Sequence, residues 1–538
     1  MKRRAGGGVK TACWVWIAAV AFASAATVPG NDVPLNTDPP GPRQVEPMVT
    51  IDPNSPVHLV AVAEESVDRN PDSTVVRVWV SRDAGQSWED AGLLPGQAAQ
   101  QTNPSVSYCK DGTVWAALND LGANAAFRVY RSLDGGSTWE ERTPARPPAN
   151  SQDLPLLTCD DSNSAFQGRL YVRYVSTGRI LVVRSDDQAE TWSDPVRVDA
   201  GGAFTSNFPG ETAIGPDGEV WIGFVKNTTP LEIRTVTSYD GGVTWQPPQT
   251  VGPVDLVNAA PYDYRRSSRP SLAVDRSDGA FRGGVHLVFG NDFGGQSDVM
   301  YSRRLPGPGS WSPTSVLEDV PAGSDQDFPL IRVDADGVVS ALWFDHRNDP
   351  GDQSIEVWGV ISRDFGSSFE ANFQISQTSF IAPTGAGAFL GDHLAHVTWS
   401  NVFLGAWPDR QRDDGDLLAS AVRLFMLDPV SGVRVDKNGT ATTISWDSQD
   451  LLYGEATVYD VSDGALTELR SDGGFERAAC AASDVPDTPW EDGRSGPSSG
   501  EGRYYLVRSR LDTDRASWGA SSTLVDHRLR LDVASPCP

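Results

Sequence analysis

The stretch SLDGGSTWEE at residues 132–141 decides the fold, because it recurs along the chain. Related stretches are SRDAGQSWED from Ser81, SDDQAETWSD from Ser185, SYDGGVTWQP from Ser238 and SRDFGSSFEA from Ser362. We call the shared pattern, S-x-D-x-G-x-[ST]-W, the Asp-turn motif. A degenerate copy, SRRLPGPGSW at residues 302–311, fills the remaining gap. The copies lie about 51 to 64 residues apart, which is near the length of one four-stranded propeller blade.

The composition of the Asp-turn motif indicates a structural role. An Asp in a tight turn accepts hydrogen bonds from the backbone N–H groups that follow it, and Gly takes the positive φ that the turn requires. The Trp ring is expected to cover the core between neighbouring strands. The copies also vary, since Ala189 replaces the Gly and Phe369 replaces the Trp. The sequence therefore predicts that the motif locks a hairpin and performs no chemistry.

Two strand signals precede each copy of the motif. The first is a short alternating run opened by proline, as in EPMVTIDP from Glu46 and FPLIRVD from Phe328, and the second is an apolar strand such as GRLYVRYVS from Gly168. Alternation with a period of two and glycine turns between the runs is typical of antiparallel meanders. A seventh unit at residues 389–425 lacks the motif. We predict an all-β chain with a seven-bladed β-propeller, or six blades if the terminal segments merge into one.

The motif and its repeat resemble the Asp-box, or bacterial neuraminidase, repeats of the sialidase superfamily, over about residues 43–428. The resemblance implies a propeller with these boxes on the blade periphery, away from the active site. Family sialidases use an arginine triad, a Tyr–Glu nucleophile and an Asp acid/base, with the first arginine in an [FY]-R-[IV]-P motif. Here the corresponding stretch reads RQVEPMV, and the acid Glu46 precedes the proline. An acid at that position would repel a substrate carboxylate, so no catalytic residue is carried over from the family.

Propeller geometry gives a second route to the site, because residues just before each first strand and just after each second strand crowd the central funnel. Paired carboxylates across that funnel suit glycoside chemistry, one acting as acid and the other as base or nucleophile. Forked arginine donors suit an anionic or hydroxyl-rich ligand. The catalytic candidates are Asp327 with Asp345 and Asp392 with Asp409. The substrate-binding candidates are Glu46, Asp153, Arg269, Arg347 and Arg410.

A structural interpretation of the same residues stays open, since an Asp before a strand often caps a turn and an Asp–Arg pair often locks a loop. The sequence predicts no cofactor, with Ca²⁺ at the acidic mouth as an alternative. The six histidines show no paired metal spacing.

The N-terminus has the features of an export signal. A basic start is followed by an apolar run from Ala12 to about Ala23 and by Ala-Ser-Ala at 23–25, so we predict a signal peptide at 1–25 and a linker at 26–42. The apolar run is too short to span a bilayer comfortably. Removing the segment's four cations moves the net charge from −27 to −31, which opposes nucleic acid as a partner. The sequence thus predicts a secreted protein, extracellular or periplasmic, without a membrane span.

Four cysteines remain once Cys13 is removed with the signal: Cys109, Cys159, Cys480 and Cys537. An even number in an exported chain fits two disulfides, although three pairings are open. We favour Cys109 with Cys159, which fall at the same point of two successive repeats, and Cys480 with Cys537.

The repeat pattern ends near Asp428, and a different pattern of short strands follows. Short strand patterns, an inward Trp446 and the stretch GRYYLVRSR from Gly502 suit a β-sandwich at 429–538. This segment resembles the fibronectin type III-like modules of exported bacterial proteins, which implies a spacer or adhesion unit.

Two functions follow. The first is a secreted glycoside hydrolase of exo-sialidase type that acts on glycoconjugates, with a carbohydrate or glycoprotein as its ligand. The second is a non-catalytic propeller that binds glycans or proteins, favoured by the missing arginine motif and by the appended module. The sequence does not define the substrate or the oligomeric state.

Overall fold

The computed structural model describes residues 26–36, 43–66, 73–96, 100–121, 126–145, 152–199, 207–257, 264–319, 323–349, 353–384, 389–399, 402–410, 416–425, 430, 432–438, 441–448, 457–472, 475, 477–494, 497, 501–511, 514–515 and 537. The predicted signal peptide lies outside these residues. Within them, no helix is long and apolar enough to cross a membrane.

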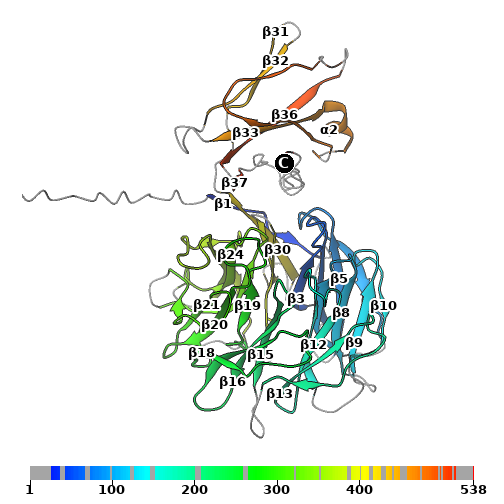
Figure 1. Ribbon diagram of the computed structural model, residues 1–538, viewed down its shortest axis with the longest axis vertical. Coiled ribbons are helices and arrows are strands. Elements are labelled where there is room, and N and C mark those ends of the chain that lie inside the picture. The colour runs from blue at the N-terminus through cyan, green and yellow to red at the C-terminus, as the bar shows by residue number, and fades with distance from the viewer. Residues whose placement is uncertain are drawn as a thin grey trace, which may run out of the picture.

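Six consecutive sheets of antiparallel strands follow one another along the chain (Figure 1). The first comprises β3 (Gln44–Ile51), β4 (Leu59–Ser66), β5 (Thr74–Ser81) and β6 (Glu89–Leu93). The second comprises β7 (Gln101–Tyr108), β8 (Val114–Asp120), β9 (Ala126–Ser132) and β10 (Glu140–Glu141). The third comprises β11 (Gln152–Cys159), β12 (Leu170–Ser176), β13 (Arg179–Ser185) and β14 (Val196–Arg197).

The next three sheets repeat this plan. The fourth comprises β15 (Phe208–Ile214), β16 (Val220–Lys226), β17 (Glu232–Ser238) and β18 (Gln249–Pro253). The fifth comprises β19 (Ser271–Val274), β20 (Val285–Asp292), β21 (Ser297–Arg304) and β22 (Ser315–Val316). The sixth comprises β23 (Gln326–Val333), β24 (Val339–Asp345), β25 (Ser354–Ser362), β26 (Phe373–Gln374) and β27 (Phe380–Ile381).

The seventh sheet joins the two ends of this region. It contains β28 (Ala395–Trp399), β29 (Val402–Asp409) and β30 (Asp416–Phe425), and β30 pairs with β1 (Ala26–Pro29) and β2 (Val33–Pro34). Residues 26–34, which we expected to belong to a linker, therefore form the outer edge of a sheet. The terminal segments do merge into one sheet, as the six-blade alternative supposed, yet the described residues still form seven sheets over this region.

Seven apolar clusters hold the sheets together, one between each successive pair. One cluster, for example, packs Val60 and Val62 of the first sheet against Val106 and Tyr108 of the second. Another packs Leu59 of the first sheet against Leu404 of the seventh, so the order of contacts returns to its start. This all-β arrangement is consistent with a β-propeller.

The Asp-turn motif has the predicted turn geometry. The carboxylate of Asp134 accepts the backbone N–H of Thr138 at 2.8 Å and its hydroxyl at 2.6 Å, and Gly136 has a φ of +90°. Ser132 adds a contact that the sequence did not predict, because its Oγ accepts the N–H of Gly136 at 2.8 Å. The partly buried motif tryptophans, such as Trp139, pack against the clusters between sheets rather than in the axial pocket described below.

Both predicted disulfides are present. Cys109 bonds Cys159 with a Cα–Cα distance of 5.4 Å, and Cys480 bonds Cys537 with a Cα–Cα distance of 4.8 Å. The first links the ends of β7 and β11, since each cysteine ends or directly follows its strand.

Two smaller antiparallel sheets form the C-terminal region. One contains β31 (Arg434–Asn438), β32 (Ala441–Ser445) and β35 (Trp490–Asp492), and the other contains β33 (Val458–Ala465), β34 (Ala479–Val485), β36 (Arg503–Leu511) and β37 (Asp514–Arg515). Trp446 is buried, as predicted, in a cluster with Tyr459 and Val461. A short helix that the strand patterns did not predict, α2 (Leu466–Asp472), follows β33.

Candidate functional site

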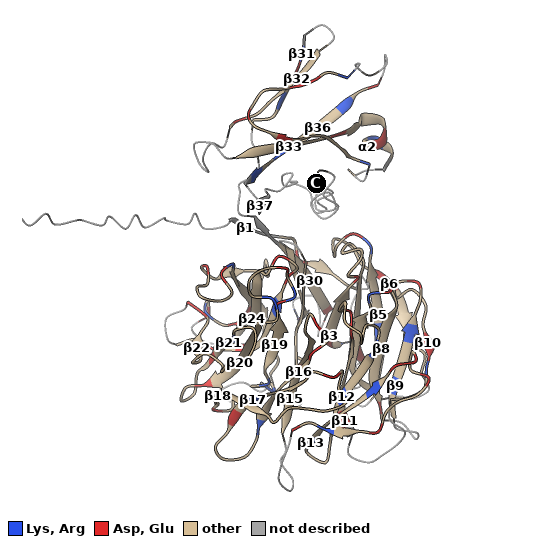
Figure 2. Cartoon of the chain, in the orientation of Figure 1, with Lys and Arg blue, Asp and Glu red and all other residues tan. Residues whose placement is uncertain are grey.

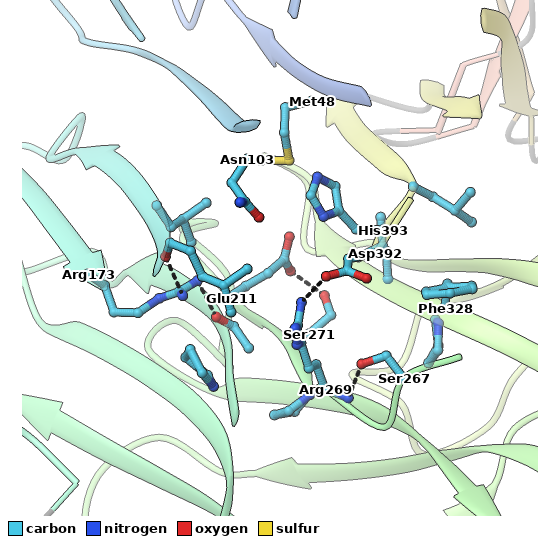
Figure 3. Close-up of a pocket in the computed structure, with 18 of the residues that line it drawn as sticks. Met48, Asn103, Arg173, Glu211, Ser267, Arg269, Ser271, Phe328, Asp392 and His393 are labelled. Atoms are coloured by element: carbon cyan, nitrogen blue, oxygen red, sulfur yellow. Dashed lines mark hydrogen bonds and ion pairs between the residues drawn. The ribbon is translucent and has the colours of Figure 1, made fainter. Parts of the chain in front are cut away.

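The inner strands converge on an axial pocket to which all seven sheets contribute. Its polar and charged lining consists of Asn103, Arg173, Glu211, Ser267, Arg269, Ser271, Asp392 and His393. Its apolar wall includes Met48, Leu156, Phe328 and Leu394. Figure 3 shows Arg173 and Glu211 facing Asp392, Arg269 and His393 across this space.

A repeated backbone feature shapes the pocket. In five inner strands the pairing register slips near a proline, as between Val45 and Met48 or between Asp327 and Leu330. Proline cannot donate to the ladder, so these positions become β-bulges, which redirect nearby side chains. Glu46, Asn103, Leu154 and Phe328, each directly before a proline, have φ values of +51° to +57°. Such conformations are disfavoured for residues other than glycine and often occur at functional sites.

Arg173 is the most unusual side chain of the pocket. It is only 6% exposed, and its Nη atoms donate to the carbonyls of Leu154 at 3.1 Å and Gly210 at 2.7 Å. Its Nε has no hydrogen-bond partner among the described residues. Burial, together with the nearby charge of Arg269, lowers the pKa of Arg173 to about 9. A buried cation without a carboxylate hydrogen bond is costly, and a bound anion would relieve that cost.

Glu211 is an acidic residue that lines the same pocket. Burial alone would raise its pKa, but Arg332 and the Ser271 hydroxyl outweigh that effect and lower it. Arg332 binds both carboxylate oxygens, at 2.7 and 2.8 Å. Glu211 is therefore a fixed charge in the pocket and not a proton donor.

Three carboxyl groups gather beside the pocket. Burial, Glu64 and Asp392 raise the pKa of Glu46 well above its usual value. Burial is also the largest cause for Glu64, whose pKa rises to about 7 despite the opposing effect of Arg43. One oxygen of Glu46, Oε2, has no hydrogen-bond partner in the part of the chain that is described. Glu46 and Glu64 are thus suited to hold a proton near neutral pH.

Asp392, unlike Glu46 and Glu64, has its carboxylate bound by two arginines. Arg269 contacts its Oδ2 at 3.1 Å and Arg265 contacts its Oδ1. The neighbouring His393 has an Nε2 without a partner among the described residues, and burial lowers the pKa of its imidazole to about 4. His393 is consequently neutral at physiological pH and offers a donor or acceptor to a ligand.

The predicted site residues divide into two groups. Asp392 and Arg269 line the pocket, and Glu46 lies in the carboxyl cluster beside it. Asp153 is exposed nearby, where Asn103 donates to its Oδ1 at 3.3 Å. These four lie at or near the axis.

The other candidates lie elsewhere. Asp327 is buried against Arg266, which donates to both its oxygens at 2.7 and 2.8 Å, and against the Tyr264 hydroxyl at 2.9 Å. Asp345 accepts hydrogen bonds from Trp343 and Arg347, and the Arg347 guanidinium stacks on Trp358 at 3.9 Å.

Asp327 and Asp345 also belong to adjoining strands of one sheet, and therefore do not face each other across a funnel. Asp409 is paired in register with Asp416 within the seventh sheet, and neither it nor Arg410 lines the axial pocket. Asp327, Asp345 and Arg347 thus belong to ion pairs and hydrogen bonds that hold loops and strands together. The geometry gives them no contact with a substrate at the axis.

Arg173, Glu211 and His393 were missed. A signal existed for the first, because Arg173 interrupts the apolar strand YVRYVS. Calcium, the alternative raised from sequence, is not favoured, because arginines occupy both oxygens of Asp392. Among the described residues no group of three or more His, Cys, Asp and Glu side chains is arranged to hold a metal ion.

Neither a family model nor a curated protein matches the sequence. Solved structures that resemble the fold include a leech intramolecular trans-sialidase in complex with 2,7-anhydro-Neu5Ac (TM-score 0.44, 11% identity, 66% of this chain and 70% of that one). Others are a Penicillium chrysogenum α-L-arabinanase (0.38, 17%, 60% and 93%) and a Dyadobacter fermentans protein of unknown function (0.43, 14%, 74% and 99%). The structural neighbours thus include sialidases and an arabinanase. Their sequence identity to this chain is too low to assign a role to any of its residues.

Proposed function

We propose that the chain is an exported glycoside hydrolase, in which the seven sheets are the blades of a sialidase-like propeller and the axial pocket holds the sugar. In this proposal residues 1–25 are the export signal and the C-terminal region is a fibronectin type III-like accessory module. The observation that carries the proposal is the contrast between two carboxyls beside the axial pocket with raised pKa values, Glu46 and Glu64, and the arginine-bound Asp392 that lines it. Paired carboxyl groups in different environments are what glycoside hydrolysis needs.

The roles follow from these environments. Glu64, with a pKa of about 7, is the general acid that protonates the leaving glycosidic oxygen. Asp392 supplies the second carboxylate on the axis, and Arg173 binds an anionic or hydroxyl-rich group of the sugar through its free Nε. Asp327 and Asp345 have no place in this mechanism, since Arg266, Trp343 and Arg347 already bind their carboxylates. Asp409 has none either, because it is in register with Asp416 within the seventh sheet and does not line the pocket.

The test is turnover by the purified protein on 4-methylumbelliferyl glycosides, with α-sialosides and α-L-arabinofuranosides included. We expect at least one substrate to be cleaved, and E64Q to lower kcat by about 100-fold or more. R173Q should chiefly raise KM. D345N is the matched control at a buried carboxylate outside the pocket, and it should keep kcat if it folds. Equal turnover in E64Q and wild type would contradict the assignment.

A second function, glycan binding without hydrolysis, is favoured by one specific observation. Both oxygens of Asp392 are already engaged by arginines, which restrains it as a base or nucleophile. Glycan-array binding that depends on Arg173, with no cleavage of any glycoside on the panel, would support this second function over the first.

A further inference from the structure

The degenerate motif at residues 302–311 changes the surface between the fourth and fifth sheets. In intact copies the motif glycine packs tightly on the preceding sheet: a Cβ at Gly136 would lie 2.7 Å from Val60, and one at Gly242 would lie 3.0 Å from Tyr171. The degenerate loop is two residues longer and has Pro306 at the position of the motif glycine counted from Ser302. Its two glycines, Gly307 and Gly309, have nothing within 4 Å of such a Cβ. The turn therefore does not cover its neighbour.

A groove lies where the degenerate turn leaves the fourth sheet uncovered. It encloses about 740 Å³, within the usual size of small-ligand sites, and is separate from the axial pocket. The fourth sheet contributes Glu219, Trp221, Thr235, Thr237, Tyr239, Gln246 and Gln249, and the degenerate loop contributes Arg304, Gly307, Pro308 and Gly309. The strands β18 and β21 that flank it lie at the outer rim of the molecule (Figure 1).

Arg304 stands where the intact motif has its Asp, and it reverses the charge at that point. It is only 5% exposed, its guanidinium lies 5.3 Å from the Trp221 ring centroid, and its Nε donates to the Gly309 carbonyl at 3.1 Å. No carboxylate among the described residues forms an ion pair with it, whereas Arg77 of the first sheet and Arg347 beside the sixth each bind two acids. The groove thus holds a nearly buried, oriented cation that no described carboxylate pairs with.

The remaining lining favours a sugar. Thr237, Gln246 and Gln249 supply hydroxyl and amide groups, and the Tyr239 side chain is 56% exposed beside them. Amide and hydroxyl groups beside an exposed aromatic ring suit a hydroxyl-rich ring that carries one charge. Glu219 also lines the groove, with its Oε2 accepting the Asp217 N–H at 3.0 Å, and disfavours a densely charged ligand.

We propose that this groove is a second saccharide site, which binds a carboxylate-bearing sugar unit of an acidic glycan. The carboxylate pairs with Arg304 and the sugar ring stacks on Tyr239. This site does not depend on hydrolysis at the axis, and it would hold an acidic chain at the rim whether or not the axial pocket cleaves it. The protein is strongly acidic overall and repels an acidic glycan elsewhere on its surface, and salt screens the attraction to Arg304 beyond the groove.

Isothermal titration calorimetry with tri-galacturonic acid tests the proposal, using the full chain with the R173Q substitution so that the axial pocket does not contribute. We expect one binding site for the trimer, and at least tenfold weaker binding of its methyl ester, which lacks the charge. R304Q should weaken binding by about tenfold or more, and Y239A, a surface change that leaves the core intact, by about fivefold.

The control is L133A, because Leu133 is 70% exposed at the same motif position in the second sheet. It should bind the trimer like the parent protein. Absence of trimer binding, or unchanged binding in both R304Q and Y239A, would overturn the proposal. Inorganic sulfate that binds as tightly as the trimer would also overturn it, by showing an anion site without sugar recognition. Failure of axial hydrolysis would leave these results unaffected, so the two proposals can fail separately.

Discussion

The rim and the axis of the molecule use the same carboxyl chemistry in opposite ways. At the rim, a hydrogen bond from the Thr191 hydroxyl and others from its own turn lower the pKa of Asp187 to about 2. At the axis, burial raises the pKa of Glu64 to about 7. The rim aspartates have their oxygens occupied by one turn, whereas the axial acids border a pocket with unused polar atoms. Figure 2 shows acidic residues both at the outer strands, as around β10, and near the middle of the molecule, around β3. The difference teaches that the repeated acids stabilise the fold, whereas Glu46 and Glu64 at the axis have pKa values that suit proton transfer.

The largest effect should come from removing the axial acid. E64Q should lower kcat by about 100- to 10,000-fold, while its melting temperature stays equal or rises, since a buried ionisable group is replaced by a neutral one. Steady-state kinetics and a thermal melt on the same sample check this. A loss of activity accompanied by a lower melting temperature would place Glu64 with the structural acids and break the comparison.

Removing an aspartate at the rim should instead lower stability and leave activity unchanged. Asp83 is 5% exposed, and its carboxylate accepts the Ser87 N–H at 2.9 Å. D83A should reduce the free energy of unfolding by about 1–3 kcal/mol, because it leaves the buried Ser81 hydroxyl without its acceptor, and should leave kcat unchanged in the folded protein. Urea unfolding measures the loss. E89A, which removes only an exposed ion pair with Arg82, is the control and should cost less than about 1 kcal/mol.

The two regions should also respond oppositely to pH. The raised pKa of Glu64 favours its protonated form in the folded state, so this stability is complete below about pH 4.5 and is lost as pH rises through 7, by about 3 kcal/mol in all. The lowered pKa values of Asp187 and Asp240 give stability that is present above about pH 4 and lost toward pH 2. Unfolding of wild type and E64Q between pH 4 and 8 isolates the Glu64 contribution. Parallel curves for the two proteins would contradict it.

The smallest expected effect is the difference in stability between a glycine substitution in an intact motif and one in the degenerate motif. Both Gly136 and Gly307 have positive φ values, of +90° and +78°, so alanine strains the backbone at either position by about 1 kcal/mol. Only Gly136 packs against a neighbour, at Val60. G136A should therefore destabilise more than G307A by about 1–2 kcal/mol in urea unfolding. Equal losses would mean that the degenerate turn is covered after all.

Much of the architecture could be predicted because it depends on local patterns. The Asp-turn motif and the proline-opened runs recur with the blade period, and both disulfides follow from cysteines at matched points of the repeats or near the C-terminus. The edge strands β1 and β2 could not be predicted, because residues 26–34 have no alternation and pair only where β30 offers an edge. The helix α2 was missed among the strand patterns around it.

The site was predicted only in part, and for a physical reason. Positions beside the inner strands led to Glu46, Arg269 and Asp392, which do lie at the axis. Arg173 sits in the middle of β12, in register with Leu156, and reaches the axis because its side chain is long. For Asp327 and Asp345 the sequence could not reveal the partners Arg266 and Trp343 that occupy their oxygens.

The most direct test of this contrast is the protonation of the axial acid itself. Infrared difference spectra of wild type minus E64Q, recorded at pH 6, should contain the C=O stretch of a protonated carboxylic acid, and this band should disappear as the pH is raised above about 8. A difference spectrum at pH 6 that contains only carboxylate bands would show that Glu64 is ionised like the rim aspartates, and would contradict the proposed division between fold and chemistry.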